Sequence, residues 1–335
     1  MKKIFLLILL MLLIIILSII NSRTPFYYDK TGGWTIGYGF SEEFPTNIDV
    51  TKNNYFSSYD LKKISDSTAF IADPFFISHN DTLYLFFELA KHNKKGADIA
   101  LMTSVNGKEF NFSGIVLDEK FHLSYPDVFQ YKNNFYMIPE TKRANNILLY
   151  ESQHFPFDWV ICDTLVKNVR LKDPSIFLSD SLNILVASDD NFTLHMYQSD
   201  SLFGTWKKHK RSKVMMGSEA RPGGRFFISE NNKLTLPIQN CTEGYGTGLS
   251  LYEMIFNNNN EYEVKRTKSL FLRANSKIKE FNKGMHHFDI QRINDGYFYV
   301  YDGNTKASEK KELHLKIPFV LTYHDIKNWL YQKLN

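Results

Sequence analysis

The sequence predicts an all-β protein, a five-bladed β-propeller preceded by one apolar N-terminal helix. After about residue 55, short runs such as "LYLFFE", "FYMIPE" and "YFYVYDG" alternate with clusters of Asn, Asp, Gly and Lys, a pattern typical of antiparallel strands and their turns. Pro74, Pro126, Pro174 and Pro222 are separated by 52, 48 and 48 residues, and each is followed by an apolar run. A period near fifty residues, with several strands in each unit, indicates a propeller.

The fifth repeat unit carries no proline. Its segment "GMHHFDIQ" (284–291) has the same position relative to the strand-like run "YFYVY" as each proline has relative to the strand that follows it. The sequence therefore predicts four regions: a signal anchor or signal peptide over 1–23, a lead-in strand region over 24–59, five blades over 60–318 and a helical tail over 319–335.

The N-terminus has the pattern of a membrane helix. Lys2 and Lys3 precede an apolar run over 4–20 in which Ser18 is the only polar residue, and this length is the short end of a membrane span. We favour an uncleaved signal anchor, and a cleaved signal peptide is the alternative. The Lys pair predicts a cytoplasmic N-terminus and an extracytoplasmic propeller. If the signal were cleaved, the propeller would be secreted.

Charge and cysteine content exclude several classes of function. Removing Lys2, Lys3 and Arg23 from the net charge of +4 leaves +1, which gives no electrostatic support for nucleic-acid binding. The chain has no CxxC pair and no Cys/His spacing of a metal site, so we expect neither a metal nor a cofactor. Pairing of Cys162 with Cys241 stays open.

The repeat also predicts a polar site at one mouth of the central channel. In each blade the start of the innermost strand and the end of the next strand lie on the same face, so residues beside each proline meet residues about fourteen positions later. The predicted inner ring is Asp73, Tyr125 with Asp127, Asp173, Arg221, and His286 or His287; the second ring is Glu88, Glu140, Ser188, Gln239 and Asp302. Converging acids, an Arg and His are typical of a site for a polar ligand.

Several segments resemble, in order, the N-terminal domain of the glucosamine inositolphosphorylceramide transferase family. They include "WTIGYGF" (34–40), "FHLSYPDVFQYKNNFYMIPET" (121–141), "EARPGGRFF" (219–227) and "GMHHFD" (284–289). The resemblance implies a propeller similar to those of arabinanase, xylosidase and invertase-type glycosidases, and a setting in glycan or glycolipid assembly. In the plant members a separate C-terminal glycosyltransferase domain is expected to carry the transfer. We expect none in this chain, so a separate glycosyltransferase is a candidate partner.

Two functions fit these residues. The related glycosidases imply an Asp before the first blade proline, an Asp before the second and a Glu before the third. Asp73 fits the first position, Tyr125 occupies the second, and Asp173 is a shorter acid at the third. An enzyme would use Asp73 and Asp173 as its carboxylate pair for glycosyl transfer or glycoside hydrolysis, with Glu140 or His287 in support.

The alternative is a non-catalytic glycan-binding or scaffold propeller that assists a separate glycosyltransferase. Under either function the expected ligand is a carbohydrate, a sugar phosphate or a glycolipid. The residues predicted to bind it are Tyr125, Asp127, Arg221, Glu88, His286, Gln239 and Asp302. A capping role for Asp-Pro explains part of the repeat, but not why the residue before Pro varies as Asp, Tyr, Asp and Arg.

Overall fold

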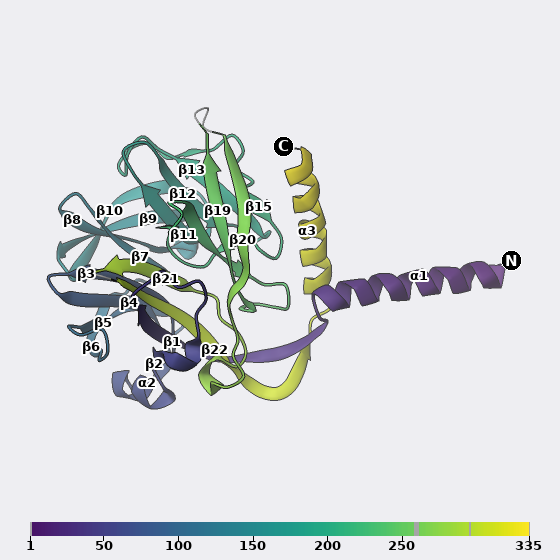
Figure 1. Ribbon diagram of the computed structural model, residues 1–335, viewed down its shortest axis with the longest axis horizontal. Coiled ribbons are helices and arrows are strands. Elements are labelled where there is room, and N and C mark those ends of the chain that lie inside the picture. Colours follow the sequence, from purple (N-terminus) through teal and green to yellow (C-terminus); the bar gives the residue numbers. More distant parts are fainter. Residues whose placement is uncertain (1, 258–260, 295, 335) are drawn as a thin grey trace.

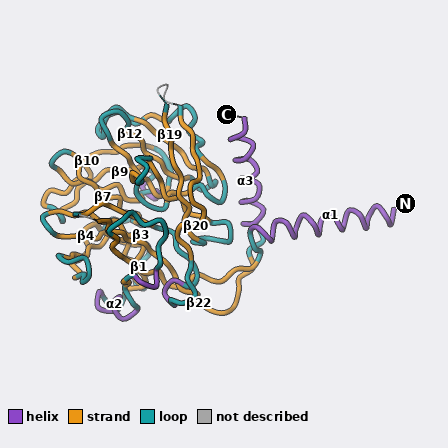
Figure 2. Tube along the Cα trace, viewed as in Figure 1, coloured by secondary structure: helices purple, strands orange, loops and turns teal. Residues whose placement is uncertain are grey.

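The computed structural model describes residues 2–257, 261–294 and 296–334, and it confirms the predicted propeller. Five antiparallel sheets of four or five strands are arranged around a common axis (Figure 1). Strands and connecting loops make up nearly the whole body of the molecule, and the long helices lie outside it (Figure 2).

Each of the first four sheets is built from consecutive strands, as expected for the blades of a propeller. The first is β3 (Thr68–His79), β4 (Thr82–Lys91), β5 (Ala97–Ser104) and β6 (Asn111–Leu117); the second is β7 (Ser124–Tyr131), β8 (Asn134–Glu140), β9 (Asn146–His154) and β10 (Phe157–Lys167). The third is β11 (Lys172–Leu178), β12 (Asn183–Ser188), β13 (Thr193–Gln198), β14 (Lys207–Lys208) and β15 (Met215–Met216); the fourth is β16 (Arg221–Pro222), β17 (Phe227–Ile228), β18 (Leu234–Asn240), β19 (Gly248–Phe256) and β20 (Tyr262–Arg273).

The fifth sheet joins the two ends of the propeller. It contains β21 (Phe288–Ile293), β22 (Gly296–Leu313), β1 (Tyr27–Ser41) and β2 (Asn54–Tyr55). β1 belongs to the segment expected to lead into the propeller, yet it pairs with β22 in register from Tyr27 opposite Leu313 to Ser41 opposite Tyr297. The N-terminal strand therefore closes the ring of blades.

The innermost strand of each of the first three blades contains a bulge at the X-Pro pair. Asp73, Tyr125 and Asp173 each have φ of 50°, in the left-handed region, and the strand register shifts at each of these positions. A bulge turns one side chain away from the regular alternation of the strand. Left-handed backbone is unfavourable for residues other than Gly and tends to occur at functional sites.

The hydrophobic core lies between neighbouring blades. Each of five buried clusters combines side chains from two adjacent sheets. Phe86 of the first blade, for example, packs edge-on against Trp159 of the second, with ring centroids 5.8 Å apart. The blades are thus held by face-to-face packing of sheets, and this packing leaves the axis for polar side chains.

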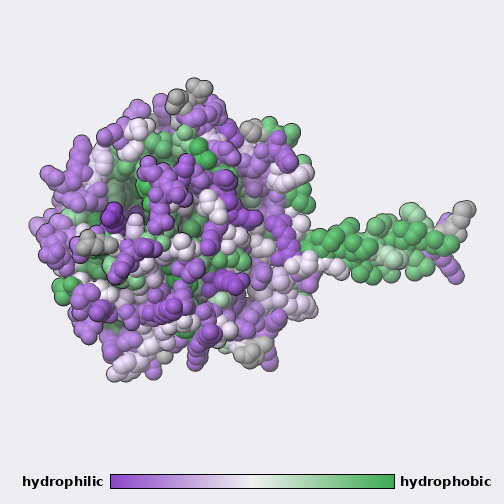
Figure 3. All heavy atoms as spheres, in the orientation of Figure 1, coloured by the Kyte–Doolittle hydropathy of each residue, from purple (hydrophilic) through white to green (hydrophobic). Residues whose placement is uncertain are grey.

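Helices occur mainly at the two ends of the chain. α1 (Lys2–Arg23) projects away from the propeller. α3 (Lys316–Leu334) begins beside the propeller end of α1 and runs roughly perpendicular to α1 (Figure 1). By length and composition α1 is apolar enough to cross a membrane, and its hydrophobic surface stands out in Figure 3. The remaining helical turns are short: η1 (Val50–Lys52), α2 (Ser58–Ile64), η2 (Lys142–Ala144) and η3 (Lys279–Phe281).

Candidate functional site

A polar cavity lies where the inner strands of all five blades converge. Its volume is about 310 Å³, at the lower end of the range for small-molecule sites. It is lined by Trp34, Phe70, Ala72, Asp73, Glu88, His122, Ser124, Glu140, Lys172, Arg221, Tyr245 and His286. Five of the predicted site residues therefore line one cavity: Asp73, Glu88, Glu140, Arg221 and His286.

Strand register brings the two predicted rings together. Glu88 lies opposite Ala72, the neighbour of Asp73, and Glu140 lies opposite Ser124, the neighbour of Tyr125. The equivalent pairs in the next two blades are Lys172 with Ser188 and Arg221 with Gln239. Each of these four blades therefore presents one residue from its first strand and one from its second at the same level of the channel.

Asp173 is an ionised acid held by two partners. Arg221 donates to both of its carboxylate oxygens, through Nε and, at 3.1 Å, through Nη2. The Gln239 side-chain amide donates a further hydrogen bond of 2.9 Å. Burial on its own would raise the pKa of Asp173, but Arg221 outweighs burial and the pKa is lowered. The ion pair with Asp173 uses both Nε and Nη2 of the Arg221 guanidinium. We therefore assign Arg221 and Gln239 the role of holding Asp173 in place.

Glu140 and Asp73 differ from Asp173 in that their pKa values are raised, not lowered. Burial, with Asp173 nearby, raises the pKa of Glu140 to about 8. Burial also raises the pKa of Asp73 to about 7, and burial raises that of Glu88 well above its ordinary value. Neighbouring acids with separated pKa values can donate and accept protons at the same pH.

His286 is held in a fixed orientation in the cavity lining, with its Nε2 3.7 Å from the Asp73 carboxylate. Its Nδ1 lies 2.7 Å from the Asp302 carboxylate, and its ring stacks on Trp34 with centroids 3.9 Å apart. Burial would lower the pKa of His286, but Asp302 raises it. Asp302 also accepts backbone N–H bonds from Asp73, His286 and His287 at 3.1, 3.1 and 2.9 Å. Asp302 therefore joins the first and fifth blades and orients the imidazole.

Seven predicted site residues are not part of the cavity lining: Tyr125, Asp127, Asp173, Ser188, Gln239, His287 and Asp302. His287 is fully buried between the rings of Phe75 and Tyr125, and burial lowers its pKa to about 3, so it is neutral. The Tyr125 hydroxyl bonds to Ser175 at 2.8 Å and to the Gly224 backbone.

Asp127 lies deeper along the channel than the bulge at Tyr125. It is 3.7 Å from Arg225, which also lies 3.2 Å from Asp289. Because the bulge interrupts the alternation of the strand, a separation of two residues does not keep Asp127 beside Tyr125 at the mouth. Asp127 instead accepts the backbone N–H of Ile176 at 3.4 Å, which ties the second blade to the third.

Sequence reasoning missed seven residues of the cavity lining: Trp34, Phe70, Ala72, His122, Ser124, Lys172 and Tyr245. Trp34 and Tyr245 form aromatic walls, and the guanidinium carbon of Arg221 lies 5.5 Å from the Tyr245 ring centre. His122 and Lys172 are also part of the lining, with His122 Nε2 3.8 Å from Glu88. Lys172 directly precedes Asp173, and this adjacency was the available signal for it. Trp34 lies outside the repeat, so periodicity carries no information about it.

Three side chains of the site have the donor set of a cation site. Asp73, His286 and Asp302 each offer one ligand atom, and these atoms lie within 4.8 Å of one another. The Asp302 carboxylate already accepts three backbone hydrogen bonds and pairs with His286. Those contacts account for its burial without an ion.

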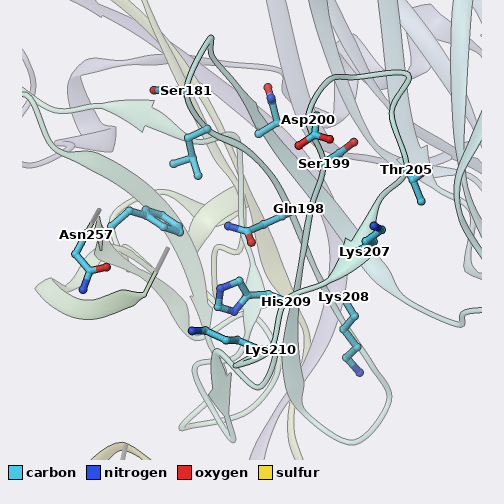
Figure 4. A pocket seen from close by; sticks show the side chains of 13 residues that line it. Ser181, Gln198, Ser199, Asp200, Thr205, Lys207, Lys208, His209, Lys210 and Asn257 are labelled. Atoms are coloured by element: carbon cyan, nitrogen blue, oxygen red, sulfur yellow. The ribbon is translucent and has the colours of Figure 1, made fainter. Parts of the chain in front are cut away.

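A wider depression of about 1050 Å³ lies where turns of the third and fourth blades meet. Lysines and small polar side chains line it (Figure 4). Lys207, Lys208 and Lys210 are exposed to solvent, as is usual for long basic side chains. Buried acids with perturbed pKa values mark the channel mouth instead, so we assign the site to the mouth.

Solved structures with the same fold include carbohydrate-active enzymes. The α-L-arabinofuranosidase of Podospora anserina matches with a TM-score of 0.50 at 12% identity, over 84% of this chain and 99% of that one. A glycosyl hydrolase from Bacteroides ovatus matches with a TM-score of 0.50 at 12% identity, over 73% and 87%. At such identities the similarity establishes the propeller fold alone.

Sequence comparison is more specific. Two curated relatives, both named glucosamine inositolphosphorylceramide transferase 1, are 33% identical to this chain: the protein of Oryza sativa subsp. japonica over 314 residues and that of Arabidopsis thaliana over 252. The matches cover 84% and 71% of this chain but 41% and 33% of the relatives, so the chain spans less than half of their length. Residues 41–304 match the family model described as "Glucosamine inositolphosphorylceramide transferase 1, N-terminal". The chain therefore belongs to the glucosamine inositolphosphorylceramide transferase family through the N-terminal domain of that family.

Proposed function

We propose that this protein binds a sugar at the mouth of the propeller channel and acts in glycan or glycolipid assembly or processing at a membrane surface. The observation that carries the proposal is the cavity of about 310 Å³ that Asp73, Glu88 and Glu140 line together with the aromatic side chain of Trp34. Carboxyl groups bond to sugar hydroxyls, and aromatic faces pack on the apolar faces of sugar rings.

The dimensions and charges of the cavity favour a neutral sugar unit over a phosphate group. A cavity at the lower end of the small-molecule range suits about one sugar unit. Asp173 neutralises Arg221 in a bidentate ion pair. Arg221 is therefore poorly available to pair with an anionic ligand. Membership of the family supports a glycolipid setting, and α1 supports attachment to a membrane with the propeller outside the cytoplasm.

The test is a binding screen of the full chain in detergent micelles against monosaccharides, sugar phosphates and sugar nucleotides. We expect a neutral sugar to raise the melting temperature, and we expect Asp73→Asn to remove that response. The control is Glu151→Gln on β9, where Glu151 accepts hydrogen bonds from Asn134 and Tyr136 outside the cavity. If a sugar stabilises the wild type and Asp73→Asn equally, the site is not at the channel mouth.

A catalytic role is the second candidate, and the contrast between Glu140 and Asp173 favours it. Glu140 is protonated where Asp173 is ionised, as required of a general acid beside a carboxylate. Incubation of the bound sugar as an aryl glycoside distinguishes the two functions. Release of the aryl group that Glu140→Gln abolishes without loss of binding indicates an enzyme, whereas binding without release indicates a recognition module that assists a separate glycosyltransferase.

A further inference from the structure

We propose that α3 lies in the membrane interface and binds the lipid surface through one face of the helix. The inference rests on the proposed membrane insertion of α1, and it adds a second contact made by the folded part of the chain. The partner surface is a bilayer that contains anionic lipids. The proposal concerns the side of the molecule on which α1 projects.

One face of α3 is firmly attached to the propeller by polar contacts. Asp325 accepts hydrogen bonds from the backbone N–H of Ser218 at 2.8 Å and from its hydroxyl at 3.1 Å. Asn328 accepts the backbone N–H of Met216 at 3.0 Å, and Gln332 donates to the carbonyl of Val214 at 2.8 Å. The spacing of these three residues, i, i+3 and i+7, defines the inner face of the helix.

The opposite face of α3 is apolar and exposed. Its exposed hydrophobic residues follow the spacing i, i+4, i+7, i+11 and i+15: Phe319, Tyr323, Ile326, Leu330 and Leu334. Trp329 lies at the edge of this face and is 60% exposed. A set of large apolar side chains of this size on one helix marks an interaction surface.

The position of α3 directs this face toward the membrane. Arg23, the last residue of α1, lies 2.5 Å from Asp325 of α3, and the Phe26 and Phe319 rings are 5.6 Å apart. Figure 1 shows α3 running across the base of α1 on the side of the propeller from which α1 projects. Hydrophobic side chains are visible along that edge in Figure 3. If α1 spans a bilayer, α3 lies along the bilayer surface.

The connection between the helix and the propeller is too short for α3 to move far from the membrane. Only residues 24–26 separate the end of α1 from the start of β1. Two hydrogen bonds hold that turn: the Thr24 N–H donates to the carbonyl of Ile20, and the Phe26 N–H donates to the Asn21 side chain. The propeller and α3 therefore follow the orientation of the anchor.

Composition favours a lipid surface over a second copy of the chain. Lys316, Lys327 and Lys333 are exposed on α3, and its single acid, Asp325, is paired with Arg23. Basic side chains around an aromatic and aliphatic face are typical of helices that lie in the interface of anionic bilayers. Tyr and Trp also favour the headgroup region. Two identical basic helices would repel each other.

Trp329 provides a selective probe of this contact. The other tryptophans, Trp34, Trp159 and Trp206, are each 7% exposed within the propeller. We would reconstitute the full chain into vesicles of phosphatidylcholine and phosphatidylglycerol, with phosphatidylcholine brominated near the carbonyl end of its acyl chains. We expect the bromine to quench part of the tryptophan emission, and we expect Trp329→Phe to abolish that quenching. Resistance of the vesicle-bound chain to carbonate extraction reports separately on insertion of α1.

Paired aspartate substitutions test the face itself. Ile326→Asp with Leu330→Asp is expected to abolish quenching of Trp329 while the chain stays vesicle-bound. The matched control, Val105→Asp, changes an exposed hydrophobic residue of the first blade and leaves the quenching unchanged. A vesicle-bound wild-type chain with unquenched Trp329 overturns the proposal, as does a disulfide between two copies of Ile326→Cys in place of quenching. A chain that fails to insert into vesicles also overturns the proposed membrane insertion of α1. None of these results alters the sugar-binding test.

Discussion

Replacement of Glu140 by Gln tests the electrostatics of the site directly. Burial, with Asp173 beside it, raises the pKa of Glu140 from 4.5 to about 8 in the folded protein. Between these two values the folded chain retains a proton that the unfolded chain has released. The contribution of Glu140 to stability is therefore complete below about pH 4.5 and is lost as the pH rises through about 8. Gln has no proton to lose and has nearly the same shape as protonated Glu140.

The expected magnitude follows from one bound proton. Each pH unit changes the unfolding free energy by about 1.4 kcal/mol for each proton that differs between the states. From about pH 5.5 to about pH 7.5 the advantage of Glu140→Gln over the wild type should therefore grow by up to about 3 kcal/mol. Sharing of the proton among the neighbouring acids makes this an upper bound.

Urea unfolding of the full chain in micelles, followed by tryptophan emission at several pH values, measures the difference. The wild type should lose stability more steeply than Glu140→Gln as the pH rises. Glu151→Gln, which lies on the same blade but outside the cavity, should follow the wild type. Parallel pH profiles for wild type and Glu140→Gln would refute the assignment of a proton to Glu140.

Three further substitutions test the arrangement of the channel. Asp302→Ala removes the acceptor of three buried backbone N–H groups. At about 1–3 kcal/mol per unsatisfied group, we expect the free energy of unfolding to fall by several kcal/mol. An unchanged melting temperature would contradict this. Tyr125→Phe removes the hydroxyl that bonds to Ser175 and Gly224 and should cost about 1–3 kcal/mol in urea unfolding, whereas a neutral result would mean that water replaces it. Trp34→Ala should weaken sugar binding by about tenfold, equivalent to about 1.4 kcal/mol, with little change in affinity expected if the sugar lies elsewhere.

The propeller was predictable because its repeat has a physical cause. Each of the first three inner strands needs a bulge at the same place, so Asp73, Tyr125 and Asp173 each precede a proline at nearly equal spacing. Counting fourteen residues onward found Glu88 and Glu140 because the two-strand hairpins of those blades have the same length. Sequence periodicity therefore predicts those features of the fold that have the same local geometry in successive blades.

Features that arise from long-range pairing could not be predicted in this way. β1 joins β22 across most of the sequence, and this pairing brings Trp34 to the cavity. The level of Asp127 in the channel depends on how the bulge turns the strand, which alternation alone does not encode. The ion pair of Asp173 with Arg221 likewise depends on the distance between two blades.

Closure of the ring by β1 has a consequence for biosynthesis. β1 is made directly after the apolar helix α1, but its partner β22 begins at Gly296. At about 5–20 residues per second, roughly 250 residues of synthesis separate them by about 10 to 50 s. During that interval β1 has an unpaired edge, which is prone to wrong pairing. The nascent propeller therefore remains an open ring until β22 is made, and the last blade to form is the one that joins its first strand to its last.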